Sequence, residues 1–590
     1  MWIRAVATAT ALGLVAGAIA LAATGTTTAP RRPVRALGAN ADGAVGLAEG
    51  EGGARARPVS GKVAKPHRTA SLAALPQHRP TRVPWVKKEL RLEAGAEADA
   101  GEQRPALDSS STLDEADGAL QTERGAIQIP APDLEVGGLG AAANPFKLVP
   151  PDPNGDVGGG FYLQMVNVAF AIYDADTGAK IEGPTFMSSL FDPATQKLCA
   201  RHDDGDPIVV YDEYADVWLI SQFALNFNTP RFAECIAVSD TSDPTGAWVA
   251  YQFDYPNQNV LNDYPKLGVW PAANNSAYFA SFNQFRCSSN VCDFDWRGAG
   301  AIAYERDAMI AGLPAGQIYV NLYGTDPNLG GQLPSDADGA LTPGANQPNV
   351  FMQFDANEWG YPHDQLELFE FTVDWATDTA TFIGPTLLTT EPFNPWICGV
   401  GKTFCVPQKG TKTKVDALND RLMFRLQYRH LGAGDARMVV THTVRAATKR
   451  AGLRWYELMD DGSGWAIVNQ GTYSPDDTKS RWMGSVAMDA DGNIATGYSL
   501  SSGKIYPSIA IAGRTAGGPA DTFDLAERKV FTGLGSVDGQ FGRWGDYSDM
   551  TVAEDGCTFY YTQQYYKKTG QWKWATRIVR FQIDPSACVA

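Results

Sequence analysis

Charged side chains, in three cases beside aromatic ones, occur in four short stretches, each of which precedes a polar turn residue by a similar distance. The stretches contain Asp206, residues 263–266, residues 481–482 and residues 543–547. The first charged residue of each stretch lies ten or twelve positions before the turn residue. This spacing predicts that the side chains occupy equivalent levels of a repeated structure and converge on one site.

The residue types in these stretches suit acid–base chemistry on an anionic sugar. Carboxylates can divide acid and base roles when their surroundings separate their pKa values. Arginine grips a carboxylate or sulfate in a bidentate manner, and an indole ring covers the apolar face of a sugar. The candidate catalytic residues are Asp206, Asp263, Asp546 and Tyr547, and the candidate ligand-binding residues are Tyr264, Lys266, Arg481, Trp482, Arg543 and Trp544. Alternatively, these side chains only lock neighbouring structural units together.

Calcium is the one cofactor that the sequence suggests, and none is required. Asp152, Asn154 and Asp156 have the alternating oxygen spacing of a calcium-binding loop. Val157 stands where the glycine of such a loop belongs, and Leu163 stands where the bidentate glutamate belongs, so a plain turn is the alternative. The histidines show no metal spacing, and the sequence contains no Gly-x-Ser-x-Gly elbow and no phosphate loop.

A repeated pattern of a polar turn followed by an aromatic strand predicts the architecture that must position these residues. Its seven copies have their turn residues at positions 156, 216, 275, 349, 420, 491 and 555. Repeats of this length, with several strands in each, indicate an all-β fold with one β-propeller of seven blades over residues 144–590. Six blades or two stacked sandwiches are the alternatives. Residues 146–149 are expected to complete the last blade.

The N-terminal part of the chain has a different character. Residues 1–23 contain an uncharged apolar run and small-residue cleavage sites, which predicts a signal peptide, with a single membrane anchor as the alternative. Residues 24–143 are dominated by Ala, Gly, Pro, Arg and Glu without an apolar period. This composition predicts an unstructured leader, either a propeptide or a linker.

Charge and cysteine content restrict the location and the partners of the protein. The net charge of −17 argues against binding to nucleic acid or to anionic membranes. Eight cysteines follow the predicted signal peptide, which favours disulfide bonds in a secreted or cell-envelope protein. Short loops and order along the chain suggest the pairs Cys199–Cys235, Cys287–Cys292, Cys398–Cys405 and Cys557–Cys588. We expect a monomer.

Several phrases of the sequence resemble those of large secreted bacterial propeller proteins that are mostly uncharacterised. The phrases lie at residues 152–158, 205–212, 263–270 and 543–548. More distantly, the chain resembles sialidase-like propellers, although the Arg-Ile-Pro signature is absent and residues 489–492 form only a degenerate Asp-box. The resemblance implies that Arg481 and Arg543 hold a substrate carboxylate and that Tyr547 is the nucleophile.

The expected function is therefore the binding or processing of an extracellular glycan at the mouth of the propeller channel. Hydrolase and lyase chemistry both fit the candidate residues. A noncatalytic binding or adhesion propeller that uses the same mouth is the alternative, and the sequence does not decide whether the protein is an enzyme.

Overall fold

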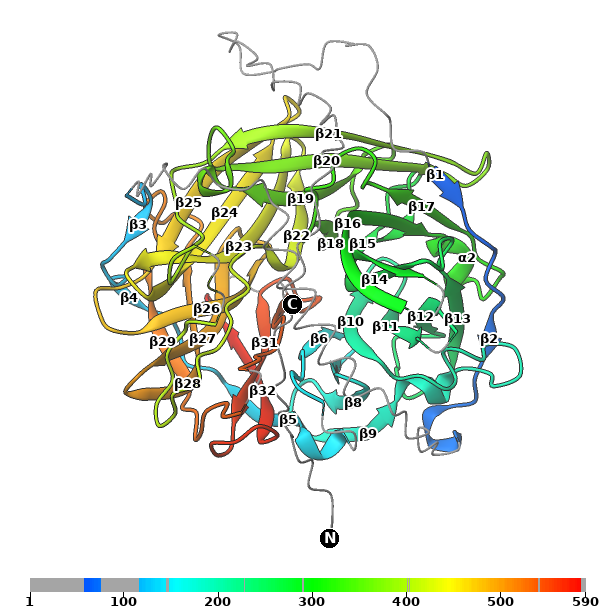
Figure 1. The fold of residues 1–590 in the computed structure, drawn as a ribbon, viewed down its shortest axis with the longest axis horizontal. Coiled ribbons are helices and arrows are strands. Elements are labelled where there is room, and N and C mark those ends of the chain that lie inside the picture. The colour runs from blue at the N-terminus through cyan, green and yellow to red at the C-terminus, as the bar shows by residue number, and fades with distance from the viewer. Residues whose placement is uncertain are drawn as a thin grey trace, which may run out of the picture. The chain divides into compact units, whose positions relative to one another are not determined.

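Seven blades of four antiparallel strands each follow one another around a central axis in the part of the chain that the structure describes (Figure 1). A parallel strand pairing joins the fourth and fifth blades into one continuous sheet. The structure is a computed structural model that describes residues 58–75, 116–144, 148–227, 229–288, 291–400, 402, 404–539 and 542–584. Strands are rich in aromatic and β-branched residues and are separated by Gly, Asn and Asp turns, as the sequence pattern predicts. The prediction of an all-β, seven-bladed propeller is confirmed.

Each blade runs from an innermost strand outward. Blade 1 contains β6 (Asn154–Gly158), β7 (Phe161–Val166), β8 (Ala169–Asp174) and β9 (Lys180–Phe186). Blade 2 contains β10 (Gly205–Asp212), β11 (Val217–Asn226), β12 (Arg231–Ser239) and β13 (Trp248–Asp254). Blade 3 contains β14 (Val260–Trp270), β15 (Ala277–Ser288), β16 (Val291–Tyr304) and β17 (Gln317–Asn321). Blade 4 contains β18 (Leu333–Asp338), β19 (Asn349–Asp355), β20 (Gln365–Asp374) and β21 (Thr379–Thr389). A five-residue helix, α2 (Arg306–Ile310), lies within blade 3.

Blades 5 to 7 follow the same plan. Blade 5 contains β22 (Met423–Gly432), β23 (Asp435–Ala447), β24 (Arg450–Asp460) and β25 (Trp465–Tyr473). Blade 6 contains β26 (Ser480–Met488), β27 (Ile494–Ser502), β28 (Ile505–Arg514) and β29 (Leu525–Phe531). Blade 7 contains β30 (Asp549–Val552), β31 (Thr558–Tyr566) and β32 (Trp574–Gln582). The innermost strands pack against one another in order, and β30 packs against β6, so the ring closes. Closure leaves no free edge between the first and last blades.

The strand that completes blade 7 comes from the N-terminal side, but not from the expected residues. Strand β5 (Leu134–Gly140) pairs antiparallel with β32, with Val136 opposite Ile578. The prediction that residues 146–149 complete this blade is wrong. Strand β5 contains three glycines and few apolar residues, so its side chains gave little sign of a strand.

Further short strands precede β5 within the segment expected to be an unstructured leader. Each adds to the outer edge of a blade: β1 (Pro58–Ser60) to β17, β2 (His67–Arg68) to β13, β3 (Leu120–Gln121) to β25 and β4 (Ile127–Gln128) to β29. The expectation is therefore wrong for these residues, because backbone hydrogen bonds to an open edge need no apolar pattern. The predicted signal peptide and leader residues 24–57 and 76–115 lie outside the described part of the chain.

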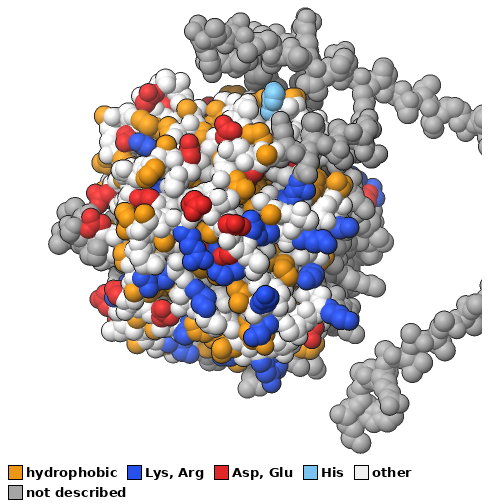
Figure 2. Space-filling view, turned by 90° about the vertical axis from the view of Figure 1, so that its left-hand side faces the viewer, with side chains coloured by type: hydrophobic (Ala, Val, Ile, Leu, Met, Phe, Trp, Pro, Cys, Tyr) orange, Lys and Arg blue, Asp and Glu red, His pale blue; other side chains and the backbone are white. Residues whose placement is uncertain are grey.

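The outer face of blades 5 and 6, to which β3 and β4 add, carries mixed charge. Lys and Arg side chains gather in the middle and lower part of this face, with Asp and Glu between them (Figure 2). Arg124, just before β4, pairs with Asp477 at 3.3 Å across this surface. Arg528 on β29 donates from Nε to the carbonyl oxygen of Ile129 at 2.9 Å. Side chains of blade 6 thus help to hold the N-terminal segment.

Five of the seven repeat copies fall at equivalent positions, and two do not. The turn residues Asp216, Asn275, Asp491 and Asp555 precede the second strand of a blade, and Asn349 begins one. By contrast, Asp156 lies within β6 and Asp420 precedes β22, so both belong to innermost strands. The pattern therefore predicts the number of blades correctly, although polar and aromatic residues occur at both ends of an innermost strand.

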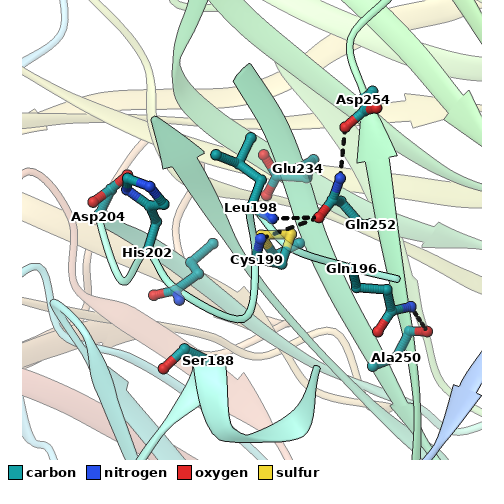
Figure 3. The surroundings of a disulfide bond; sticks show 12 residues. Ser188, Gln196, Leu198, Cys199, His202, Asp204, Glu234, Ala250, Gln252 and Asp254 are labelled. Carbon is teal, nitrogen blue, oxygen red and sulfur yellow. Dashed lines mark hydrogen bonds and ion pairs between the residues drawn. A yellow bond between two sulfur atoms is a disulfide. The ribbon is translucent and has the colours of Figure 1, made fainter. Parts of the chain in front are cut away.

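Two of the four predicted disulfides are confirmed, Cys199–Cys235 and Cys398–Cys405. Beside the first, Gln252 on β13 accepts hydrogen bonds from the backbone N–H groups of Leu198 and Cys199 at 2.9 and 3.2 Å (Figure 3). Cys287 and Cys557 are also disulfide-bonded. The side chains of their predicted partners, Cys292 and Cys588, lie outside the described residues, so those two pairings stay predictions. No helix among the described residues is long and apolar enough to span a membrane.

Candidate functional site

A bulge at the start of several innermost strands determines how their side chains face the channel. The register shifts between Gly205 and Ile208 in β10, between Asp263 and Lys266 in β14, and between Trp482 and Ser485 in β26. Residues with positive φ lie in these bulges: Asp206 (52°), Tyr264 (56°) and Met483 (51°). Non-glycine residues seldom adopt this conformation, so the same unusual turn recurs in three blades.

Lys266 lies at the centre of the resulting cluster. Its side chain is fully buried, and its Nζ lies 3.5 Å from the ring centroid of Tyr264 and 3.8 Å from that of Tyr547. The ammonium group donates one hydrogen bond, to the carbonyl oxygen of Pro265 at 2.8 Å. Burial lowers the pKa of Lys266 to about 7, although Asp206 and Asp546 act in the opposite direction. The amine can therefore gain or lose a proton near neutral pH.

Buried carboxylates surround this lysine. Arg543 donates from Nη2 to both oxygens of Asp546, at 2.6 and 2.8 Å. The backbone N–H of Asp546 donates to Oδ1 of Asp152 at 2.7 Å, and this contact joins blade 7 to the start of blade 1. Asn167 accepts a hydrogen bond from the backbone N–H of Asp206 at 2.8 Å and also donates to Asp152. One hydrogen-bonded network thus connects the starts of three different innermost strands, β6, β10 and β30.

Three aspartates of this cluster, Asp152, Asp206 and Asp263, hold protons more tightly than ordinary aspartates. Burial raises the pKa of Asp152 to about 7, and the neighbouring Asp546 carboxylate adds to this effect. Burial also raises the pKa of Asp263 to about 6. The pKa of Asp206 lies well above its usual range, because of burial and then the charges of Asp263 and Asp152. The cluster therefore contains both proton donors and proton acceptors near neutral pH.

Two tyrosine hydroxyls complete the cluster. Tyr264 and Tyr547 are buried, and their rings lie 6.0 Å apart at an angle of 61°. Neither hydroxyl has a hydrogen-bond partner among the described residues. A buried hydroxyl without a partner is costly, and a bound ligand with a polar group would remove that cost.

One cation of the cluster, Arg421, is not among the residues predicted from the sequence. The guanidinium carbon of Arg421 lies 4.7 Å from the ring centroid of Tyr264, and Arg421 pairs with Asp420 at 2.9 and 3.1 Å. Both residues end the long connection between β21 and β22. The only sequence signal for Arg421 is its position beside Asp420, one of the seven repeated turn residues. Asp152, interpreted as a metal ligand, was likewise missed as a member of this cluster.

Arg481 does not join the cluster, and this corrects the expectation that it shares a ligand with Arg543. It donates from Nε and Nη2 to Glu527 on β29, at 2.6 and 3.2 Å, and from Nη2 to Asp477 at 3.0 Å. Glu527 lies on the outermost strand of blade 6. The side chain of Arg481 is fully buried in these ion pairs, so its interactions hold the structure of the blade.

The two tryptophans are core residues rather than sugar platforms. Trp482 and Trp544 are buried, and their rings pack 5.0 Å apart between blades 6 and 7. Each indole N–H donates to a serine of β27, Trp482 to Ser501 and Trp544 to Ser499, both at 3.1 Å. Neither ring has a free face for a ligand, so the structure corrects their assignment as ligand-binding residues.

The residues of the suggested calcium loop do not fit a calcium ion. Asn154 accepts the backbone N–H of Val209 at 2.6 Å. Asp156 accepts the backbone N–H groups of Tyr211 and Val157, both at 2.8 Å. These oxygens bind backbone, chiefly that of blade 2, and among the described residues no group of three His, Cys, Asp or Glu side chains is arranged to hold a metal. Asn154 and Asp156 thus connect blades 1 and 2, whereas Asp152 connects blade 1 to blade 7.

Comparisons with known proteins give remote structural similarities only. No protein family and no curated protein matches the sequence. In structure, the chain is similar to a Hadza microbial sialidase, with a TM-score of 0.33, 10% identity and coverage of 73% of this chain and 74% of that one. It is also similar to an α-L-arabinanase from Penicillium chrysogenum, with a TM-score of 0.29, 10% identity and coverage of 80% and 100%.

An arabinanase from Bacillus subtilis shows a similarity of the same order, with a TM-score of 0.24, 10% identity and coverage of 73% and 93%. The expected likeness to sialidase-type propellers is thus found, but at a remote level. Scores this low carry no argument about substrate or site residues. The function is therefore argued from the cluster itself.

Proposed function

We propose that the protein processes an extracellular glycan at the end of the channel where the innermost strands begin. The observation that carries the proposal is the position of the Lys266 ammonium group between the rings of Tyr264 and Tyr547, in a cluster that contains Asp152, Asp206 and Asp263, whose pKa values are raised. Perturbed pKa values concentrate at functional sites because catalysis needs groups that exchange protons at the working pH.

Acid–base cleavage of a sugar chain needs one group that donates a proton and one that accepts it. In the proposed reaction, Asp206 protonates the departing oxygen, because burial raises its pKa and so favours its protonated form. Asp263, whose pKa is about 6, is ionised at neutral pH and accepts the other proton. Lys266 and Arg543 attract an anionic group of the sugar, and the hydroxyls of Tyr264 and Tyr547 offer hydrogen bonds. The same groups serve hydrolysis, with water as the nucleophile, or elimination by a lyase.

Location outside the cytoplasm is part of this proposal. Disulfides such as Cys199–Cys235 and Cys398–Cys405 persist in oxidising compartments. The apolar run at the N-terminus is the corresponding export signal.

A propeller that binds a glycan without turnover is the second candidate. The observation that favours it is burial: Asp206, Lys266 and Asp546 all have side chains at or near full burial. Buried charges of this kind also lock blades together. Binding without product release is the expected behaviour under this candidate.

A panel of neutral and anionic polysaccharides separates the two candidates. The assay follows new reducing ends for hydrolysis and unsaturated products for elimination. Wild type is compared with Asp206→Asn and Lys266→Met, and the matched control is Arg481→Lys, which keeps a buried cation outside the cluster. The proposal expects product with wild type and with the control, and loss of product with the two cluster variants. Binding without product supports the noncatalytic propeller.

A further inference from the structure

Exposed lysines gather on loops at the end of the blades where the innermost strands begin, which is the end that carries the acid–base cluster. The loops are residues 407–414, 503–504, 532–539 and 567–573. We call their seven exposed lysines the lysine surface: Lys409, Lys412, Lys414, Lys504, Lys567, Lys568 and Lys573. The turns between first and second strands lie at the opposite end, and as the structure describes them they contain no lysine.

Hydrogen bonds hold these loops against one another. The backbone N–H of Lys409 donates to the carbonyl oxygen of Ile505, at the start of β28, at 3.2 Å. The hydroxyl of Ser536, in the connection between β29 and β30, donates to the carbonyl oxygen of Lys409 at 2.8 Å. The carbonyl oxygen of Ser536 in turn accepts the backbone N–H of Gly570, in the turn between β31 and β32, at 3.0 Å. Lysines from separate parts of the chain are therefore fixed as one surface.

No carboxylate neutralises the ammonium groups of the lysine surface. None of the seven forms an ion pair within the described part of the chain, whereas Lys479, elsewhere at the same end, pairs with Asp477 at 3.0 Å. Asp538 is the one acidic side chain described in these loops, and its Oδ1 accepts the hydroxyls of Thr411 and Thr413 at 2.8 and 3.2 Å. Uncompensated positive charge in a chain of net charge −17 favours a ligand with several negative groups, which releases counterions on binding.

Aromatic side chains lie among the lysines. Trp572 is 39% exposed and directly precedes Lys573. Nζ of Lys409 lies 4.9 Å from the ring centroid of Tyr506. An exposed indole covers the apolar face of a sugar, and an ammonium group beside it binds a sulfate or carboxylate on the same sugar. A charged sugar chain uses both features.

The lysine surface reaches the mouth of the channel. A Cβ on Gly542, the residue before Arg543, would lie 2.5 Å from the carbonyl oxygen of Lys414, so the two segments are in contact. A chain that lies on the lysines can therefore continue toward the acid–base cluster. A flat anionic bilayer fits less well, because it would also meet exposed carboxylates at the same end, those of Glu391 and Asp476.

We propose that the lysine surface binds a polyanionic glycan, in which sulfate or carboxylate groups recur along the chain. This inference deepens the proposed function, because it names the class of glycan, and it rests on that function for the link between binding and cleavage. Binding itself needs no turnover.

Affinity of the full chain for immobilised polysaccharides tests the inference. Heparin supplies recurring sulfates, polygalacturonate supplies recurring carboxylates, and dextran is the neutral match. Wild type is expected to bind heparin or polygalacturonate and not dextran, with an affinity that falls as the salt concentration rises.

Two variants show where the polysaccharide binds. The first removes three charges from the lysine surface by Lys567→Gln, Lys568→Gln and Lys573→Gln, and its affinity should fall roughly tenfold. The matched control changes the net charge equally by removing three exposed lysines elsewhere, through Lys62→Gln, Lys180→Gln and Lys529→Gln. The control should bind like wild type.

Absence of binding to both charged polysaccharides, equal binding of dextran, or an equal loss of affinity in the control variant would overturn the inference. Tighter binding of phosphatidylglycerol vesicles or of duplex DNA at the same salt concentration would also overturn it, because the surface would then serve another class of polyanion. Thermal unfolding checks that the variants fold. If the first variant does not, Lys412→Gln combined with Lys504→Gln carries the same test.

Turnover separates this inference from the proposed function. Weaker binding in the lysine variant, together with no product from wild type, supports the inference and counts against cleavage. Product from wild type, together with unchanged affinity in the lysine variant, overturns the inference and leaves the proposed function standing.

Discussion

Arg543 and Asp546, three residues apart before β30, form a buried ion pair in which one guanidinium nitrogen bonds both carboxylate oxygens, at 2.6 and 2.8 Å. The pair fixes Asp546 so that its backbone N–H reaches Asp152 of the first blade. A local contact between close neighbours in sequence therefore joins the last blade to the start of the first. The candidate site is built on this junction.

Replacing Lys266 with Met should change how stability depends on pH above neutrality. The pKa of Lys266 is about 7 in the folded state and 10.5 ordinarily, so the unfolded chain binds more protons between these values. Stability of the wild type therefore rises with pH across this window. Lys266→Met lacks this titrating amine, so its free energy of unfolding does not rise in this way. The stability of the variant relative to wild type should therefore be greatest below pH 7 and decline toward pH 10.5. Urea unfolding at several pH values measures this, and a constant difference between the two proteins would contradict it.

Asp152→Asn tests a pH dependence of stability that has the opposite sign. The pKa of Asp152 is raised from 3.8 to about 7, so the folded protein binds more protons than the unfolded chain between these values. Wild type should lose stability as the pH rises through this window, and the variant should lack that loss. The variant's stability relative to wild type should therefore increase from pH 4 to pH 7. Asp378→Asn, at an exposed turn position, is the control and should show no such trend. A flat difference for Asp152→Asn would refute the raised pKa.

Arg481→Ala should damage the fold rather than the site. The change leaves Glu527 and Asp477 without their buried cation, and removal of one partner of a buried pair costs about 3–5 kcal/mol. Thermal unfolding should show a large fall in Tm, with binding per folded molecule unchanged. Loss of binding at an unchanged Tm would contradict this prediction and would show that Arg481 contributes to the ligand site.

The fold was more predictable from the sequence than the site. Alternating turns and aromatic strands indicate the blades, because each repeat meets the same packing demands. The site depends on distant contacts. Arg481 and Arg543 have the same neighbour, a tryptophan, yet Arg481 pairs outward with Glu527 on a strand of its own blade, whereas Arg543 pairs with Asp546. Arg421 enters the site from a long connection that carries no repeat pattern. Residue spacing along the chain predicts neither the different partners of Arg481 and Arg543 nor the position of Arg421 in the site.

Truncation distinguishes the N-terminal residues that build the propeller from those that do not. A chain that begins at residue 145 lacks β5, so the outer edge of β32 is left open and the ring loses its closing strand. We expect loss of the cooperative thermal transition. A chain that begins at residue 116 keeps β3, β4 and β5 and should retain the transition. Equal transitions in the two chains would show that β5 does not close the ring.

Product formation by Asp206→Asn, compared with wild type on the polysaccharide that wild type cleaves, tests the central claim most directly. The substitution keeps the size of the side chain and removes the proton that the reaction is proposed to use. General acid catalysis contributes about 10²–10⁴-fold, so kcat should fall by that order, while Tm and the affinity for the polysaccharide change little. Cleavage by Asp206→Asn at the wild-type rate, in a folded protein, would contradict the account.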